Sequence, residues 1–566
     1  MLSLLNVKSG ALAVAFMTAT TVLSLGAGSA WACGGTFCDT SSPVNQTAER
    51  IIFVDREDGT VTAVVEIQYQ GSAEQFSWVL PVPGIPEIDV SSTLALNRLQ
   101  GATNPNYRLI TEVQGSCREE QFGDFANDDS GGANNSFEDE ADDANNDVVV
   151  VGAGTVGPFD FEIISVDPEL ENAADVAVQW LEENGYEVTP QTPDLLGPYL
   201  EEGMNLVGFR LTNGAGVESI RPIMMTYETA DPMIPIRPTG VAANDDMGVM
   251  VFNVAPGRAV PSNYRHLILN EAALNWFNPN SNYLDVVNLA ADESGGQGFV
   301  TEMAAPTSDF GETILRGFEA QSIAQFRQIS AETNAQDVIF SSYDFSNWDG
   351  YSDAFRLAWS GDDGDLDMLI GCPECVADDD GVIEDFDVAT FLTAMDDFVL
   401  APMEATQEAL GSEAYLTRFF TTMSAFEMTK DPIFKVNAEL PDVSNSHTAT
   451  RTILCNPFVT QDEASWRVIF DGVEIYGRNR VWPVDTEDLP ANRRVEQLSD
   501  EGDPEVVTDN TALIQQAIID AGAGPTAQEG GCACSTPGGQ LPASGGGALA
   551  MLLLGLVTFA RRGRRA

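Results

Sequence analysis

The chain has 566 residues, 44% of them hydrophobic, which is enough to form one or more folded cores. It carries 86 acidic and 27 basic residues, a formal net charge of −59. A surface of that charge repels phosphate backbones, so the composition excludes the nucleic-acid-binding classes.

The N-terminus has the three-part pattern of a secretory signal peptide. A lysine precedes an apolar run over residues 11–25, and small residues follow. Ala30 and Ala32 form an A-x-A cleavage pattern directly before Cys33. We therefore predict that residues 1–32 are a cleaved signal peptide and that the body is exported.

Six cysteines follow the cleavage pattern and precede the C-terminal tail, and an even number in an exported chain favours disulfides. Two pairs would close short loops, and the remaining two cysteines then pair by elimination, although spacing alone does not fix connectivity. The expected pairs are Cys33–Cys38, Cys372–Cys375 and Cys117–Cys455. The C-x-x-C spacing could also indicate a redox dithiol or half a zinc site, but its acidic surroundings and the lack of a second ligand pair favour a structural disulfide.

Short strands and amphipathic helices alternate along the body. Runs rich in β-branched and aromatic residues predict strands, and Asp58-Gly59 predicts a hairpin turn. The predicted strands cover residues 50–54, 60–69, 74–83, 147–166, 205–212, 219–227, 248–254, 451–458 and 466–477. Apolar residues at helical spacing predict helices over residues 169–184, 312–330, 386–398 and 404–411.

This pattern predicts an α+β fold: a β-rich exported body with a few packed amphipathic helices, divided into two lobes, then a C-terminal stalk and a single short transmembrane segment. The predicted organisation is a signal peptide (1–32), a β-rich α+β domain (33–330) with an acidic disordered insertion (123–147), a second α+β lobe with the C-x-x-C loop (331–486), a polar linker or stalk (487–531) and a sorting region (532–566).

Catalytic motifs such as H-E-x-x-H, G-x-S-x-G and the P-loop are absent from the sequence, so no catalytic residue is assigned. The chain has two histidines. His266 alternates with apolar residues at a strand end, where a structural role is favoured over that of a general base. His447 lies in the polar run SNSHTAT and is expected in a surface loop.

An asparagine-rich block over residues 276–293 could hold a carbohydrate or a cation, or could bond its own backbone through Asx turns, and the structural role is favoured. Its oxygens come from Asn278, Asn280, Asn282, Asp285, Asp292 and Glu293, and its ring faces come from Trp276, Phe277 and Tyr283.

A second acidic block partly matches a calcium-binding loop. The matching carboxylates are Asp378, Asp380, Glu384 and Asp387. The pattern is broken at its first ligand position, where Val376 stands, and at its last, which has Asp in place of Glu. A weak, extracellular-type Ca²⁺ site is one interpretation, and a solvated acidic loop is the other.

The tail combines paired cysteines, a Gly/Pro spacer, an apolar run and a basic end. The apolar run over residues 543–560 would span roughly 27 Å as a helix, which is marginal for crossing a bilayer. The paired cysteines are Cys532 and Cys534, and the basic end contains Arg561, Arg562, Arg564 and Arg565. By the positive-inside rule, these arginines would lie in the cytoplasm.

This tail resembles the myxobacterial-type C-terminal sorting signal. The resemblance implies recognition by an intramembrane sorting peptidase, processing or modification at Cys532 or Cys534, removal of the tail and display at the cell surface. Residues 541–545 (LPASG) also resemble a sortase motif, but that motif does not explain the paired cysteines. The alternative is a permanent inner-membrane anchor, with the body in the periplasm and the tail as its membrane contact.

The body resembles the bacterial family called domain of unknown function 2330, over about residues 32–330 and more weakly beyond Cys372. The resemblance rests on long blocks: ACGGTFCDTSSPVNQTAERIIFV, VTAVVEIQYQGSAEQFSWVLPVPGIPEI, GMNLVGFRLTNGAGVESIRPIMMTYE and MIPIRPTGVAANDDMGVMVFNVAPGRAVPSNYRHLILNEAALNWFNPN. The family implies an exported location and brings no mechanism.

These features favour a non-enzymatic protein of the cell surface or envelope whose body binds a ligand or partner or has a structural role. One alternative is an exported hydrolase that uses carboxylates, which would require a cleft with paired Asp or Glu, one of them with a raised pKa. Another is an adhesion module stabilised by Ca²⁺.

Overall fold

The computed structural model describes residues 45–70, 76–118, 148–186, 188–212, 219–241, 243–377 and 382–524. The predicted signal peptide with Ala30 and Ala32, the Cys33–Cys38 loop, the acidic insertion at 123–147 and the sorting tail with its apolar run at 543–560 lie outside these residues. Among the helices within them, none has the length and apolar character needed to cross a membrane.

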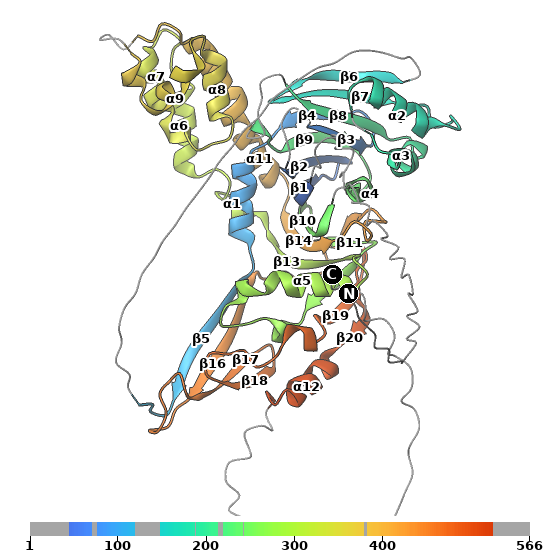
Figure 1. Ribbon diagram of the computed structural model, residues 1–566, viewed down its shortest axis with the longest axis vertical. Helices are drawn as coiled ribbons and strands as arrows, with labels where there is room; N and C mark the ends of the chain where they lie inside the picture. The colour runs from blue at the N-terminus through green and yellow to red at the C-terminus, as the bar shows by residue number, and fades with distance from the viewer. Residues whose placement is uncertain are drawn as a thin grey trace, which may run out of the picture.

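A ten-stranded mixed sheet runs through the body (Figure 1). Its strands β1 and β10 are parallel, as are β12 and β13, and the other neighbours are antiparallel. In spatial order the sheet contains β20 (Glu505–Asp509), β19 (Asn492–Gln497), β12 (Arg265–Leu269), β13 (Gly298–Pro306), β14 (Tyr415–Met423), β10 (Ala243–Ala255), β1 (Asn45–Asp55), β2 (Thr60–Gln70), β9 (Ile223–Glu228) and β4 (Glu87–Val90).

The central strand β1 is buried on both faces. Alternate side chains enter two different cores, with Ile52 in one and Phe53 in the other. The turn into β2 follows the predicted chemistry, because Asp58 accepts a hydrogen bond from the Thr60 amide (2.9 Å) and Gly59 adopts a φ of 85°. The predicted hairpin at Asp58-Gly59 is confirmed.

Three smaller sheets surround the main one. One orders β3 (Ser77–Val82), β8 (Asn205–Leu211), β7 (Phe159–Ser165) and β6 (Val149–Val156), beside helices α2 (Ala173–Glu183) and α3 (Thr192–Glu201). A second pairs β11 (Ala259–Pro261) with β15 (Phe434–Val436). The third, named here the arm sheet, orders β18 (Val473–Arg478), β17 (Ser465–Phe470), β16 (Ser446–Leu454) and β5 (Asn106–Gln114), and β5 and β16 extend away from the body (Figure 1).

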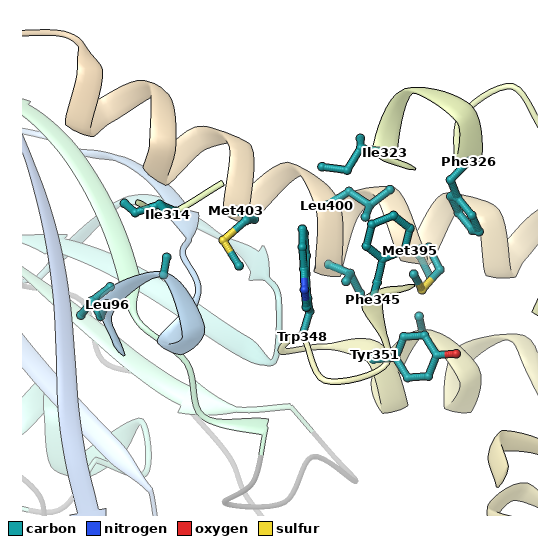
Figure 2. Packing of buried hydrophobic residues seen from close by; sticks show 14 of the residues in the cluster. Leu96, Ile314, Ile323, Phe326, Phe345, Trp348, Tyr351, Met395, Leu400 and Met403 are labelled. Atoms are coloured by element: carbon teal, nitrogen blue, oxygen red, sulfur yellow. The ribbon is translucent and has the colours of Figure 1, made fainter. Parts of the chain in front are cut away.

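A group of helices covers one face of the main sheet and continues beyond it (Figure 1). It contains α1 (Thr93–Thr103), α6 (Gly317–Phe326), α7 (Ala335–Ser342), α8 (Tyr351–Ala358), α9 (Asp363–Gly371), α10 (Val388–Met395) and α11 (Ala401–Gly411), the last two joined by a π-helical turn at Asp396–Leu400. In its core Trp348 packs edge-to-face on Phe345, with ring centroids 5.1 Å apart, among residues of α6, α8 and α11 (Figure 2). The other helices of the body are α4 (Ile236–Thr239), α5 (Tyr283–Glu293) and α12 (Thr511–Asp520).

The mixed, β-rich α+β fold predicted from the sequence is confirmed, but two predicted boundaries are wrong. Strand β14 follows residue 330 yet lies between β13 and β10, so the sheet does not divide into lobes there. The predicted linker 487–531 contributes β19 and β20 to the edge of the main sheet, and α12 packs beside them. The prediction is wrong because the polar composition of this segment indicated solvent exposure, whereas polar groups of β19 are hydrogen-bonded inside the protein. The side-chain amide of Asn492, for example, donates to the Ala290 carbonyl (2.7 Å).

The structure contains two of the expected disulfides, Cys372–Cys375 and Cys117–Cys455. The second joins the far ends of β5 and β16 in the arm sheet. These strands are parallel and in register from Asn106 opposite Ser446 to Gln114 opposite Leu454, so the cysteines that follow them meet. The disulfide therefore holds together two strands that are distant in the chain.

Candidate functional site

A cavity of about 680 Å³ lies where the arm sheet meets the edge of the main sheet. Its walls come from the beginnings of β5 and β16, from β12, β13 and β19, from the loop at 439–443, from the turn between β17 and β18, and from α12. Both histidines of the chain line it. Its volume is within the range of pockets that hold small ligands.

His447 forms the first polar group of this cavity. Its Nδ1 lies 2.6 Å from Oε1 of Glu271, and its ring stacks on Tyr107 with centroids 4.5 Å apart. Tyr107 is the register partner of His447 in the parallel pair β5–β16, which places the two rings on the same face. Because a carboxylate holds Nδ1, the proton of the neutral ring lies on Nδ1, and Nε2 keeps its lone pair as an acceptor or base.

Glu302 forms the second polar group, and a β-bulge places it there. Thr301 pairs with Phe419 and Met303 pairs with the adjacent Arg418, so Glu302 is the extra residue of β13. Glu302 is 4% exposed, and its carboxylate accepts a hydrogen bond from the Tyr283 hydroxyl and lies 2.6 Å from Nε of Arg418. Burial raises the pKa of Glu302, while Arg418 and the Tyr283 hydrogen bond act in the opposite direction.

His266 forms the third polar group, on β12. Its Nδ1 lies 3.0 Å from Oε2 of Glu496, its register partner on β19, and Arg494 contacts the other oxygen of Glu496 at 2.7 Å. Burial lowers the pKa of His266, so the ring is neutral near pH 7 and donates its Nδ1 proton to Glu496. Burial alone would raise the pKa of Glu496, but the hydrogen bond from His266 and the nearby positive charges lower it overall.

The prediction for His266 agrees with the structure, and the prediction for His447 does not. His266 lies at a strand and is buried, as expected, but it also lines the cavity. The expectation that His447 lies in a surface loop is wrong: it is the second residue of β16, and its side chain is 28% exposed. Pairing with β5 buries this polar segment against Tyr107, and a polar run without periodicity gives no signal of that pairing.

The asparagine-rich block has the structural role that was favoured for it. The Asn282 amide donates to the Ala273 carbonyl (2.8 Å), and the Glu293 carboxylate accepts from the backbone amides of Ala491 and Asn492 (2.8 and 3.0 Å). Tyr283 is the member of this block that lines the cavity. Besides the histidines, the aromatic residues within this polar block were therefore a sequence signal near the site.

Two of the four candidate calcium ligands, Glu384 and Asp387, lie in the described part of the chain. Asp387 caps α10 by accepting a hydrogen bond from the Thr390 amide (2.6 Å), which lowers the pKa of its carboxyl. Glu384 is exposed, and Asp378 and Asp380 lie outside the described residues. Among the residues that are described, no group of three or more His, Cys, Asp or Glu could hold a metal ion.

Comparison with known proteins identifies a family. No curated protein and no solved structure matches the chain. The family described as "Uncharacterized protein conserved in bacteria (DUF2330)" matches residues 27–314, which is half of the chain, and these residues include His266, Tyr283 and Glu302. The match confirms the family resemblance of the N-terminal part of the body, and the chain belongs to this uncharacterised bacterial family.

Proposed function

We propose that this chain is an exported protein of the bacterial envelope whose body binds a small ligand in the cavity described above. The observation that carries the proposal is that a chain with two histidines brings both to one cavity, each against a glutamate. A ligand pocket generally combines apolar walls with a few convergent polar groups. Here Val300, Phe470 and Val473 supply apolar surface between the polar groups.

Ligand binding is expected to raise the melting temperature of the mature protein by a few degrees at saturating ligand. The measurement is thermal unfolding of the mature chain with a panel of amino acids, dipeptides, monocarboxylates and sugars. Val473→Trp would fill the cavity and is expected to abolish the shift. Val481→Trp is the matched control, since Val481 is 66% exposed and does not line the cavity. If Val473→Trp keeps the full shift while remaining folded, the cavity is not the binding site.

The location is part of the proposal. The signal-peptide pattern and the tail support export and display at the cell surface, with retention in the inner membrane as the alternative. The intact mass of the mature protein in its native cell distinguishes the two. A chain that ends near Cys532 or Cys534 and is removed by external protease supports display, whereas a chain that retains its last arginines and resists the protease would contradict it.

A second candidate is acid–base hydrolysis in the same cavity. The observation that favours it is the combination of a His447–Glu271 pair with a buried glutamate, Glu302, whose pKa is raised by burial. Hydrolysis of ester, amide or glycoside substrates by the purified protein is the assay. Glu271→Gln is expected to lower such a rate at least tenfold, because the amide removes the negative charge that stabilises the protonated form of His447. If the wild-type protein turns over none of these substrates, the simpler binding role stands.

A further inference from the structure

One buried cation lines the cavity without a carboxylate partner. Arg258, in the loop between β10 and β11, is 6% exposed. Its Nη1 donates to the Pro441 carbonyl (2.7 Å), its Nε has no hydrogen-bond partner, and no carboxylate oxygen of the described residues lies within 4.0 Å. Buried charges are costly unless they are paired, so this arrangement is unusual inside a protein.

The other buried arginines among the described residues show the contrast. Three of them form ion pairs, and the fourth lies over two aromatic rings, which attract a cation. The ion pairs are Arg50 with Glu66, Arg221 with Asp353 and Arg418 with Glu302, and Arg451 lies over Phe277 and Trp466. Arg258 has neither kind of partner, and it is the one that lines the cavity.

The carboxylates nearest to Arg258 are already engaged. Glu496 is held by His266 and Arg494, and Asp442 accepts a hydrogen bond from the Tyr415 hydroxyl. Burial lowers the pKa of Arg258, and the negative charges of Glu496 and Asp442 offset this only in part. The guanidinium therefore lacks a close anion, although it faces a cavity that a ligand can enter.

The surroundings favour a carboxylate over a phosphate as that anion. The planar guanidinium matches the two oxygens of a carboxylate. A dianionic phosphate would be repelled more strongly than a singly charged carboxylate by the other acidic side chains that line the cavity. These are Glu271, Glu302, Glu439, Asp471 and Asp503. We infer that the ligand is a monocarboxylate with an apolar body, whose carboxylate pairs with Arg258 and whose body lies against Val300, Phe470 and Leu498. This inference rests on the proposed function.

The test compares acids with their amides, which differ in charge and hardly in shape. Phenylacetate and phenylacetamide, and N-acetylleucine and its amide, are titrated into the mature protein at pH 7 and constant ionic strength, with calorimetry as the readout. The acids are expected to bind roughly tenfold to a hundredfold more tightly than the amides, because a charge-assisted hydrogen-bonded pair is lost with the amide. Arg258→Gln is expected to abolish that preference, and Arg258→Lys, which keeps the charge, to retain part of it.

Arg451→Gln is the matched control, since it removes a buried arginine that does not line the cavity and should leave the acid preference unchanged. Equal binding of acid and amide by the wild-type protein, or no binding of either, overturns the inference. So does an acid preference that survives Arg258→Gln. An uncharged compound that stabilises the wild-type protein but not Val473→Trp would overturn the inference that the ligand is a carboxylate, while leaving the proposed function intact.

Discussion

Replacing Arg418 with methionine is expected to lower the free energy of unfolding by about 3–5 kcal/mol, because it leaves a glutamate buried without its cation. Arg418 is 2% exposed and its Nε lies 2.6 Å from Glu302. Its Nη1 also donates to Thr103 (2.9 Å) and to the Gln100 carbonyl (3.0 Å) on α1. Methionine keeps most of the aliphatic packing, so the loss measures the polar contacts. Urea-induced unfolding of the mature chain is the measurement.

Two further variants make this prediction specific. The double variant Glu302→Gln/Arg418→Met removes both charges and is expected to recover much of the loss, since the loss comes mainly from the unpaired carboxylate. Arg327→Met breaks an exposed pair with Asp396 and Glu404 and should cost less than about 1 kcal/mol. A loss at Arg418 no larger than the loss at Arg327 would contradict the prediction.

The pH dependence of Arg418→Met follows from Glu302. The pKa of Glu302 is raised in the folded protein, so its ionisation disfavours the folded state above the ordinary pKa of a glutamate. Without Arg418 the pKa rises further. The stability gap between Arg418→Met and the wild type should therefore shrink as the pH falls and Glu302 takes up a proton.

Local features of the fold could be predicted because they depend on neighbours in the sequence. Runs of β-branched and aromatic residues predicted the strands around Ile52 and Val64, and helical spacing predicted the helix that contains Ala177 and Trp180. Asp58-Gly59 predicted a turn that the backbone at Gly59 adopts. In each case the signal and the structure lie within a few residues of each other.

The candidate site depends on pairings that the sequence does not show. His447 reaches the cavity because β16 pairs in parallel with β5, and Glu302 reaches it because one residue is inserted in β13. A bulge leaves no periodic signal, and parallel partners can lie anywhere in the chain. Strand β19 was also not predicted, because inward-facing polar residues such as Glu496 cannot be distinguished from solvent-exposed ones in a sequence.

Replacing Glu49 with glutamine is expected to stabilise the protein by about 3 kcal/mol at pH 8 and to change its stability little below pH 4.5. Glu49 on β1 is buried, and its Oε2 has no hydrogen-bond partner among the described residues. Burial raises the pKa of Glu49 from 4.5 to about 7. Between these two values the folded protein holds a proton that the unfolded chain has lost, so wild-type stability falls as the pH rises through this range and then levels off.

Glutamine has nearly the shape of protonated glutamate and does not ionise, so the stability of Glu49→Gln should lack this dependence. Glu66→Gln is the matched control, because Glu66 lies on the neighbouring strand β2 but pairs with Arg50. Removing that carboxylate leaves Arg50 without its anion and is expected to destabilise the protein at pH 8, the opposite sign. Thermal unfolding of both variants from pH 4 to pH 9 measures the two effects. If Glu49→Gln instead destabilises the protein at pH 8, then Glu49 is ionised and paired in the folded state, and burial does not control its charge.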